Sequence, residues 1–219
     1  MSGSKQPTRY VSKTFETVSA FPTKLSEPNN NNTTDLDNDD DDDNGDVVGN
    51  RNLPLRVSLF ECPPAFVRDF AALFPDVACF REKRSFCLLL FSFATANDMS
   101  GWNQDVEEER ARLHRVFLKI ADDVVSRLVD GVSDNGAEVT GSTSWADFVD
   151  PIGGKPFRGS YCNDNLFETD PRLRPFGVRI EDLGCCKCVR LEEFGSKAFV
   201  GCLFTDAAFD APIWTELLS

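Results

Sequence analysis

The chain has 219 residues, 41% of them hydrophobic, and a formal net charge of −13 at pH 7. An acidic chain repels phosphate backbones, and no stripe of basic residues interleaved with aromatic ones is present, so we do not expect nucleic-acid binding. The longest apolar run, residues 86–93, is far shorter than the roughly 20 residues of a membrane-spanning helix, so we expect a soluble protein.

Residues 1–52 predict a disordered arm. Residues 1–26 hold four basic residues against one acidic residue, and Val11, Phe15 and Val18 recur at helical spacing. This is a weak pattern of a mitochondrial presequence, for which a disordered leader of ordinary charge is the alternative. Four consecutive asparagines and eight aspartates follow between residues 29 and 46, which predicts an acidic, solvated linker. We expect residues 53–219 to form the folded domain.

The domain opens with strand and helix patterns. Leu55, Val57 and Leu59 alternate with polar residues, which predicts a half-buried strand. A helix with an apolar face should occupy residues 63–75, since prolines stand at both of its ends. The continuous apolar run of residues 86–93 predicts a central strand that is covered on both faces.

Residues 103–128 predict the longest helix. Six apolar side chains fall on one stripe of it: Val106, Leu113, Phe117, Ile120, Val124 and Leu128. The only histidine of the chain, His114, lies beside this stripe among arginines. We expect His114 to be a solvated helix residue rather than a ligand or a base. Residues 129–140 predict a loop.

The last third of the chain predicts mainly strands. Residues 145–149 and a turn at 150–154 precede two strand patterns, 186–191 and 198–204, which Gly195 should join as a hairpin. Helices and strands mix without regular alternation along the chain. We therefore predict an α+β domain with a largely antiparallel sheet and flanking helices.

Three cysteines stand close together, Cys185, Cys186 and Cys188. The eight cysteines of the chain are too few for a disulfide scaffold, and no secretory signal pattern precedes them, so we expect reduced thiols. Cys185 should be the accessible thiol, because it follows Gly184 at the edge of a predicted strand. Nearby Lys187 and Arg190 are expected to favour its thiolate form. Inert packing of each cysteine is the alternative.

Other chemistries remain as alternatives. A zinc site or a thiol-redox pair could use the Cys185, Cys186 and Cys188 cluster, although a second Cys-x-x-Cys is missing and no helix opens there. A flavin-dependent reductase would need a phosphate-binding glycine pattern, which we do not find. Four carboxylates could meet in space to form a site, although roles in turns and helix caps are the alternative for them. These carboxylates are Asp147, Asp150, Glu168 and Asp170.

Several motifs in order carry a family resemblance. The main ones are Trp-Ala-Asp-Phe-Val-Asp-Pro at residues 145–151, Asn-Leu-Phe-Glu-Thr-Asp at 165–170 and Glu-Asp-Leu-Gly-Cys-Cys-Lys at 181–187. They closely resemble the CblD family of intracellular vitamin B12 trafficking, the methylmalonic aciduria and homocystinuria type D proteins. The resemblance runs from about residue 57 to the C-terminus and leaves out the arm.

The resemblance implies a non-enzymatic adaptor, without catalytic residues, whose domain is similar to a flavin-reductase or nitroreductase fold without flavin. Such an adaptor would receive cobalamin by forming a heterodimer with the type C cobalamin-processing protein. It would direct the cofactor to methionine synthase and methylmalonyl-CoA mutase. The implied location is the cytoplasm, with mitochondria as a second candidate.

The resemblance also implies the site residues. The first cysteine of the Gly-Cys-Cys motif, Cys185, would be the thiolate that coordinates the cobalt of cob(II)alamin. Leu183, Gly184 and Asp170 would support it. Cys188 stands where the family pattern leads us to expect an apolar strand residue, so a local disulfide or a second metal ligand remains open.

Overall fold

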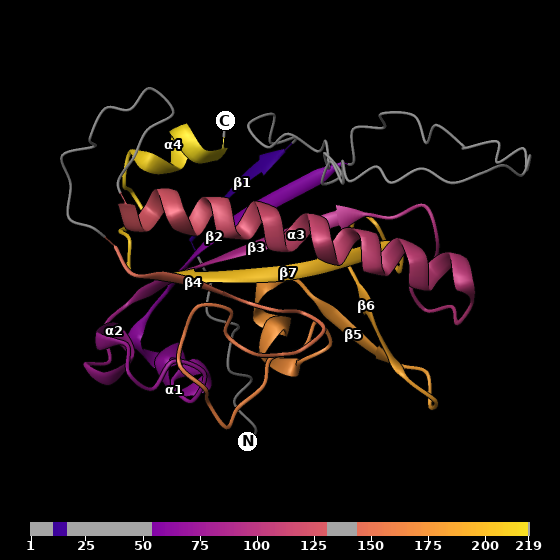
Figure 1. Cartoon of the computed structure of the whole chain (residues 1–219), viewed down its shortest axis with the longest axis horizontal. Coiled ribbons are helices and arrows are strands. Elements are labelled where there is room, and N and C mark those ends of the chain that lie inside the picture. Colours follow the sequence, from indigo (N-terminus) through magenta and orange to yellow (C-terminus); the bar gives the residue numbers. More distant parts are fainter. Residues whose placement is uncertain (1–10, 17–53, 131–143, 219) are drawn as a thin grey trace, which may run out of the picture.

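The computed structural model describes residues 11–16, 54–130 and 144–218 (Figure 1). They form a five-stranded antiparallel sheet with strand order β1-β2-β3-β7-β4 and a separate antiparallel pair, β5 and β6. The strands of the large sheet are β1 (Ser12–Glu16), β2 (Leu55–Cys62), β3 (Phe86–Ala94), β7 (Ala198–Thr205) and β4 (Ala146–Val149). The smaller pair consists of β5 (Arg179–Asp182) and β6 (Lys187–Arg190).

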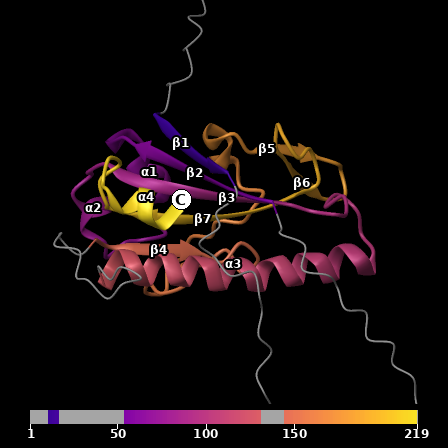
Figure 2. The same ribbon diagram turned by 90° about the horizontal axis from the view of Figure 1, so that it is seen from above.

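Helices cover both faces of the large sheet, as Figures 1 and 2 show. The long helix α3 (Gln104–Asp130) and the C-terminal α4 (Ile213–Leu218) pack on one face. The short segments η1 (Pro64–Phe66), α1 (Val67–Phe70), α2 (Ala78–Arg81) and η2 (Pro171–Phe176) pack on the other. The prediction of an α+β domain with an antiparallel sheet is therefore confirmed. None of the described helices has the length and apolar character to cross a membrane.

The central strand β3 is buried along nearly its whole length, as the apolar run predicts. Leu89 and Phe91 contribute to the core beneath α3, whereas Leu88 and Leu90 contribute to the core on the opposite face. This division follows from the two-residue period of a strand. Two separate apolar cores thus lie on the two faces of one sheet.

Helix α3 confirms the predicted apolar stripe, whose six side chains are all buried. Its Phe117 ring packs directly on Gly201 of β7. A Cβ atom at this position would lie 2.4 Å from the ring of Phe117. Glycine is required here because only a backbone without a side chain leaves room for the phenylalanine ring.

Strand β1 corrects the interpretation of the N-terminal arm. The predicted helical spacing of Val11 and Phe15 is wrong for these residues, because residues 12–16 pair with β2. Phe15 lies opposite Val57 and packs against the core beneath α3, and Lys13 Nζ donates to the carbonyl of Phe209 at 3.1 Å. The stability of a short edge strand depends on such contacts with residues that are distant in the sequence. The rest of the predicted arm, like most of the predicted loop at 129–140, lies outside the described residues.

The predicted hairpin between 186–191 and 198–204 is also wrong. Strand β6 pairs with β5, and only an isolated bridge joins Leu191 to Gly195. Strand β7 instead lies between β3 and β4 in the large sheet. The missed strand β5 is largely exposed and polar, so its sequence carries no apolar alternation. The predicted helix at 63–75 is shorter than expected, since α1 ends at Phe70.

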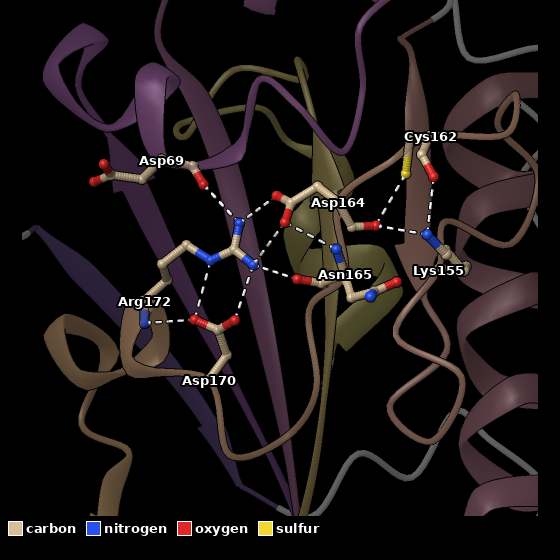
Figure 3. Close-up of polar contacts among 7 residues, drawn as sticks. All are labelled: Asp69, Lys155, Cys162, Asp164, Asn165, Asp170 and Arg172. Carbon is tan, nitrogen blue, oxygen red and sulfur yellow. Dashed lines mark hydrogen bonds and ion pairs between the residues drawn. The ribbon is translucent and has the colours of Figure 1, made fainter.

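One guanidinium organises the segment that precedes β5 (Figure 3). Arg172 binds Asp164 Oδ2 with Nη1 at 2.5 Å and Asp170 Oδ2 with Nη2 at 2.8 Å. It also donates to the carbonyls of Asn165 and, at 2.9 Å, of Asp69 in α1. Asp170 caps η2 by accepting the backbone N–H of Arg172 at 2.8 Å. Arg172 therefore joins residues 164–170 to the core-packing helix α1.

We expect Gly201→Ala to lower the free energy of unfolding by about 1 to 3 kcal/mol, because the new methyl group overlaps the Phe117 ring. Phe117→Leu removes that ring. The double variant should lose less stability than the sum of the two single losses, which denaturant unfolding can measure. Additive losses would show that the two residues do not restrict each other.

We expect Arg172→Lys to lower the free energy of unfolding by about 2 kcal/mol, since an ammonium group cannot satisfy four acceptors that a planar guanidinium reaches. The exposed neighbour Arg174 provides the matched control. Arg174→Lys should stay within about 0.5 kcal/mol of wild type in the same urea titration. Equal stability of both variants would contradict an organising role for Arg172.

Candidate functional site

The expected site lies in the turn of the β5–β6 hairpin. Asp182 and Lys187 close the ladder, so residues 183–186 form the connecting loop. Leu183 N–H donates to the carbonyl of Cys186 at 2.9 Å, and Gly184 N–H donates to Asp182 Oδ1 at 2.9 Å. Gly184 has a φ of 84°, a left-handed conformation that glycine adopts without steric cost. The loop thereby places Cys185 at the end of the hairpin.

Two adjacent thiols occupy this loop. Cys185 is exposed and Cys186 is half-buried, and their Sγ atoms are 3.6 Å apart. The indole Nε1 of Trp102 donates to Cys186 Sγ at 3.4 Å. Trp102 comes from the segment before α3 and is itself 77% exposed, which is unusual for so large an apolar side chain. The hydrogen bond from Trp102 thus restrains Cys186, while Cys185 remains accessible to an incoming group.

The pKa of Cys185 is raised, first by its hydrogen bond to Cys186 and then by electrostatic repulsion from that thiol. The expectation that Lys187 and Arg190 favour the thiolate is therefore wrong for the chain alone. Arg190 is engaged by Glu181, whose Oε2 lies 2.9 Å from Nη2. In the unliganded protein, Cys185 is an accessible thiol that is mostly protonated at neutral pH.

All eight cysteines are free thiols, so Cys188 forms no local disulfide. Cys188 is buried, and its Sγ lies 4.0 Å from Glu181 Oε2. Burial is the main cause that raises the pKa of Cys188. Among the residues that the structure describes, no three His, Cys, Asp or Glu side chains are grouped so that they could hold a metal ion. The zinc alternative gains no support from these residues.

A cleft of about 330 Å³ adjoins the hairpin. Cys186 and Lys187 line it on one side, and the exposed side chains of Trp102, Ile152 and Phe167 form apolar walls. Its other lining residues are Met99, Gly101, Glu107, Arg110, Pro151, Glu168 and Thr169. The segments 99–110, 151–152 and 167–169 therefore meet the cysteine loop at one surface.

An ion pair lies in this cleft. Arg110 Nη1 pairs with Glu168 Oε1, and Arg110 Nη2 donates to the carbonyl of Met99 at 3.1 Å. Burial raises the pKa of Glu168, while Arg110 acts in the opposite direction. Glu168 Oε2 is buried and has no hydrogen-bond partner among the described residues. The pair therefore leaves one acceptor unsatisfied.

The four carboxylates that could have met do not form a cluster, because each has its own partner. Asp147 accepts the backbone N–H groups of Phe148, Arg158 and Gly159, and Asp170 binds Arg172. Turn and cap roles are thus confirmed for these two.

The expectation of a solvated His114 is wrong. His114 Nε2 lies 2.8 Å from Asp150 Oδ1, and the imidazole side chain is only 20% exposed. Asp150 also accepts the N–H of Ile152 in the same turn at 2.9 Å. This contact fastens α3 to the turn that forms one wall of the cleft.

The three supporting residues have different positions. Leu183 is exposed and Gly184 shapes the loop, so both belong to the thiol hairpin. Asp170 belongs to the Arg172 network. Burial would raise the pKa of Asp170, but hydrogen bonds from Arg172 and the charge of Lys187 lower it overall. Asp170 therefore carries a negative charge that interacts with Lys187 of the hairpin.

Trp102 and Arg110 were not predicted as site residues, and Glu168 was named only as one of four carboxylates that could meet in space. Nothing local in the sequence shows that the indole of Trp102 reaches Cys186, 84 positions away. Arg110 and Glu168 are separated by 58 positions. For Arg110, a charged residue near the start of an amphipathic helix was the available signal, and such residues are usually solvated.

Comparisons with known proteins identify the family of this chain. The family model for the methylmalonic aciduria and homocystinuria type D protein matches residues 5–218, so the likeness includes most of the arm that the motifs left out. A protein of Gallus gallus described as cobalamin trafficking protein CblD is 36% identical over 166 residues, 76% of this chain and 51% of its own length. Those of Mus musculus and Homo sapiens are each 38% identical over 157 residues, 71% of this chain and 48% of theirs.

The matches cover most of this chain but only part of its relatives. The chain spans about half the length of the curated relatives it matches. Within that half, the family model covers nearly every residue, including the thiol hairpin and all the segments that line the cleft. The chain belongs to the methylmalonic aciduria and homocystinuria type D protein family.

Proposed function

We propose that the protein is a non-enzymatic adaptor of cobalamin trafficking that offers Cys185 as a thiolate ligand to the cobalt of cob(II)alamin. The observation that supports this role best is the exposed Sγ of Cys185 at the end of a short, tightly hydrogen-bonded hairpin. The curated relatives are described as cobalamin trafficking proteins. A polarizable sulfur is a suitable ligand for a transition metal that is already held in a macrocycle.

The type C cobalamin-processing protein is the proposed partner, which would bring the cofactor to the hairpin. One thiolate supplied from this chain makes the cobalt part of the interface between the two proteins. Because the pKa of Cys185 is raised, coordination must displace its proton, and complex formation should strengthen as pH rises. The thiolate of Cys185 would therefore form when cobalt binds and displaces the proton.

Delivery to methionine synthase and methylmalonyl-CoA mutase completes the proposal. The expected location is the cytoplasm, with mitochondria as the second candidate. A nitroreductase-like ancestry without flavin is part of the same proposal, and a preparation that binds no FMN would agree with it.

A thiol-redox function is the second candidate, because the Sγ atoms of Cys185 and Cys186 are only 3.6 Å apart. It predicts turnover of a disulfide substrate by the chain alone. The adaptor predicts no such turnover and a requirement for cobalamin and partner. An assay of disulfide reduction separates the two functions.

We expect iodoacetamide to modify Cys185 first, because buried thiols such as Cys79 and Cys202, with pKa values of about 11 and about 12, react slowly. Cys186→Ala should shift the alkylation of Cys185 to lower pH, since it removes the group that raises the pKa. Peptide mass mapping over a pH series measures this shift. Cys188→Ala is the matched control and should leave the profile of Cys185 unchanged.

We expect a cobalt–thiolate signal in the visible and EPR spectra when the wild-type chain meets cob(II)alamin on the type C partner. Cys185→Ser should abolish the signal because a hydroxyl is a poor soft donor. Cys186→Ser provides the control and should retain it. The signal of the wild type should grow with rising pH. Persistence of the signal in Cys185→Ser would remove cobalt ligation from this residue.

A further inference from the structure

The cleft beside the thiol hairpin has features that cobalt ligation by Cys185 does not use. Four charged side chains line it, Glu107 and Glu168 against Arg110 and Lys187. Their formal charges cancel, and exposed apolar side chains stand around them. Such a surface favours a neutral ligand that combines apolar area with hydrogen-bonding groups.

Glu168 indicates which hydrogen-bonding group is missing. Its Oε1 is paired with Arg110, whereas Oε2 is buried and without a donor among the described residues. A buried acceptor without a partner costs roughly 1 to 3 kcal/mol. A ligand that brings an N–H group to this oxygen recovers that cost on binding. A second carboxylate at the same place would instead be repelled.

We propose that this cleft binds one propionamide side chain of the corrin ring, with Glu168 Oε2 accepting the amide N–H and Arg110 or Lys187 donating to the amide carbonyl. The proposal rests on the proposed function. The rim of a corrin carries neutral primary carboxamides on an apolar macrocycle, which is the combination that the cleft favours. The propionamides are the longer of these side chains and reach farthest from the ring.

The position of the cleft favours the corrin over an amide of the partner protein. Cys186 lines the cleft, and its Sγ lies 3.6 Å from that of Cys185. A corrin whose cobalt binds Cys185 must rest part of its rim on the adjoining surface, and the cleft is that surface. Because Oε2 is closed to water in the free chain, the amide enters when a wall side chain turns. Trp102, which is 77% exposed, is the wall side chain that would turn, and its turn would break the 3.4 Å hydrogen bond to Cys186.

Cobalamin derivatives with a single propionamide hydrolysed to a carboxylate test this contact. Each isomer, as the cob(II) form on the type C partner, is titrated with the full-length chain while the cobalt–thiolate EPR signal is followed. One isomer should bind the wild type about tenfold more weakly, because its carboxylate faces Glu168. Glu168→Gln should restore that isomer, since a glutamine amide donates to the introduced carboxylate.

Glu107→Gln is the matched control, because Glu107 lines the same cleft but is exposed, and it should not restore the weakened isomer. Denaturant unfolding of Glu168→Gln establishes that the variant is folded. Equal binding of every isomer to the wild type would overturn the amide contact, as would a loss that Glu168→Gln leaves unchanged. A missing signal with unmodified cob(II)alamin would overturn the proposed function itself, and the contact with it.

Discussion

The guanidinium of Arg172 is the contact on which the geometry of the site depends. It binds Asn165 and Asp170, the two ends of the segment that contains Phe167 and Glu168. Through the carbonyl of Asp69, the same group is attached to α1, which packs on the large sheet. The wall of the cleft is thus fixed at both of its ends to a buried core. A loop without such a clamp would lose the position of its side chains.

The part of the wall formed by the turn at residues 150–154 is held by a different contact. His114 of α3 lies against Asp150, and Asp150 shapes the turn that carries Ile152 into the cleft. Helix α3 also supplies Arg110, four positions before His114 on the same helix face. Helix α3 therefore positions both the turn that carries Ile152 and the guanidinium of Arg110. Phe117 of this helix packs so closely on Gly201 that a side chain there would displace the ring.

The sequence predicted those parts of the fold that depend on periodicity within one element. Strand β3 and helix α3 bury long apolar surfaces, and their patterns remain readable without a partner. Strands β1 and β5 are short, polar and paired with distant or exposed neighbours, so their sequences resemble loops. The accessibility of Cys185 was predicted from its place after Gly184, and its role as a ligand comes from the family resemblance. The contact of Trp102 with Cys186 and the pairing of Glu168 with Arg110 became visible only when distant segments met. Contacts across 58 or 84 positions leave no local periodicity.

The raised pKa of Cys185 has a consequence for the proposed role as a cobalt ligand. A thiolate exposed at the end of a hairpin would react with oxidants and stray metals, whereas a protonated thiol reacts slowly with both. Cys186 keeps the proton on Cys185, and the indole of Trp102 holds Cys186 in place. A cobalt ion can displace this proton, since metal binding and deprotonation are coupled. In the proposed function, Cys186 would keep Cys185 protonated before the cofactor arrives, and Cys185 would lose this proton when cobalt binds.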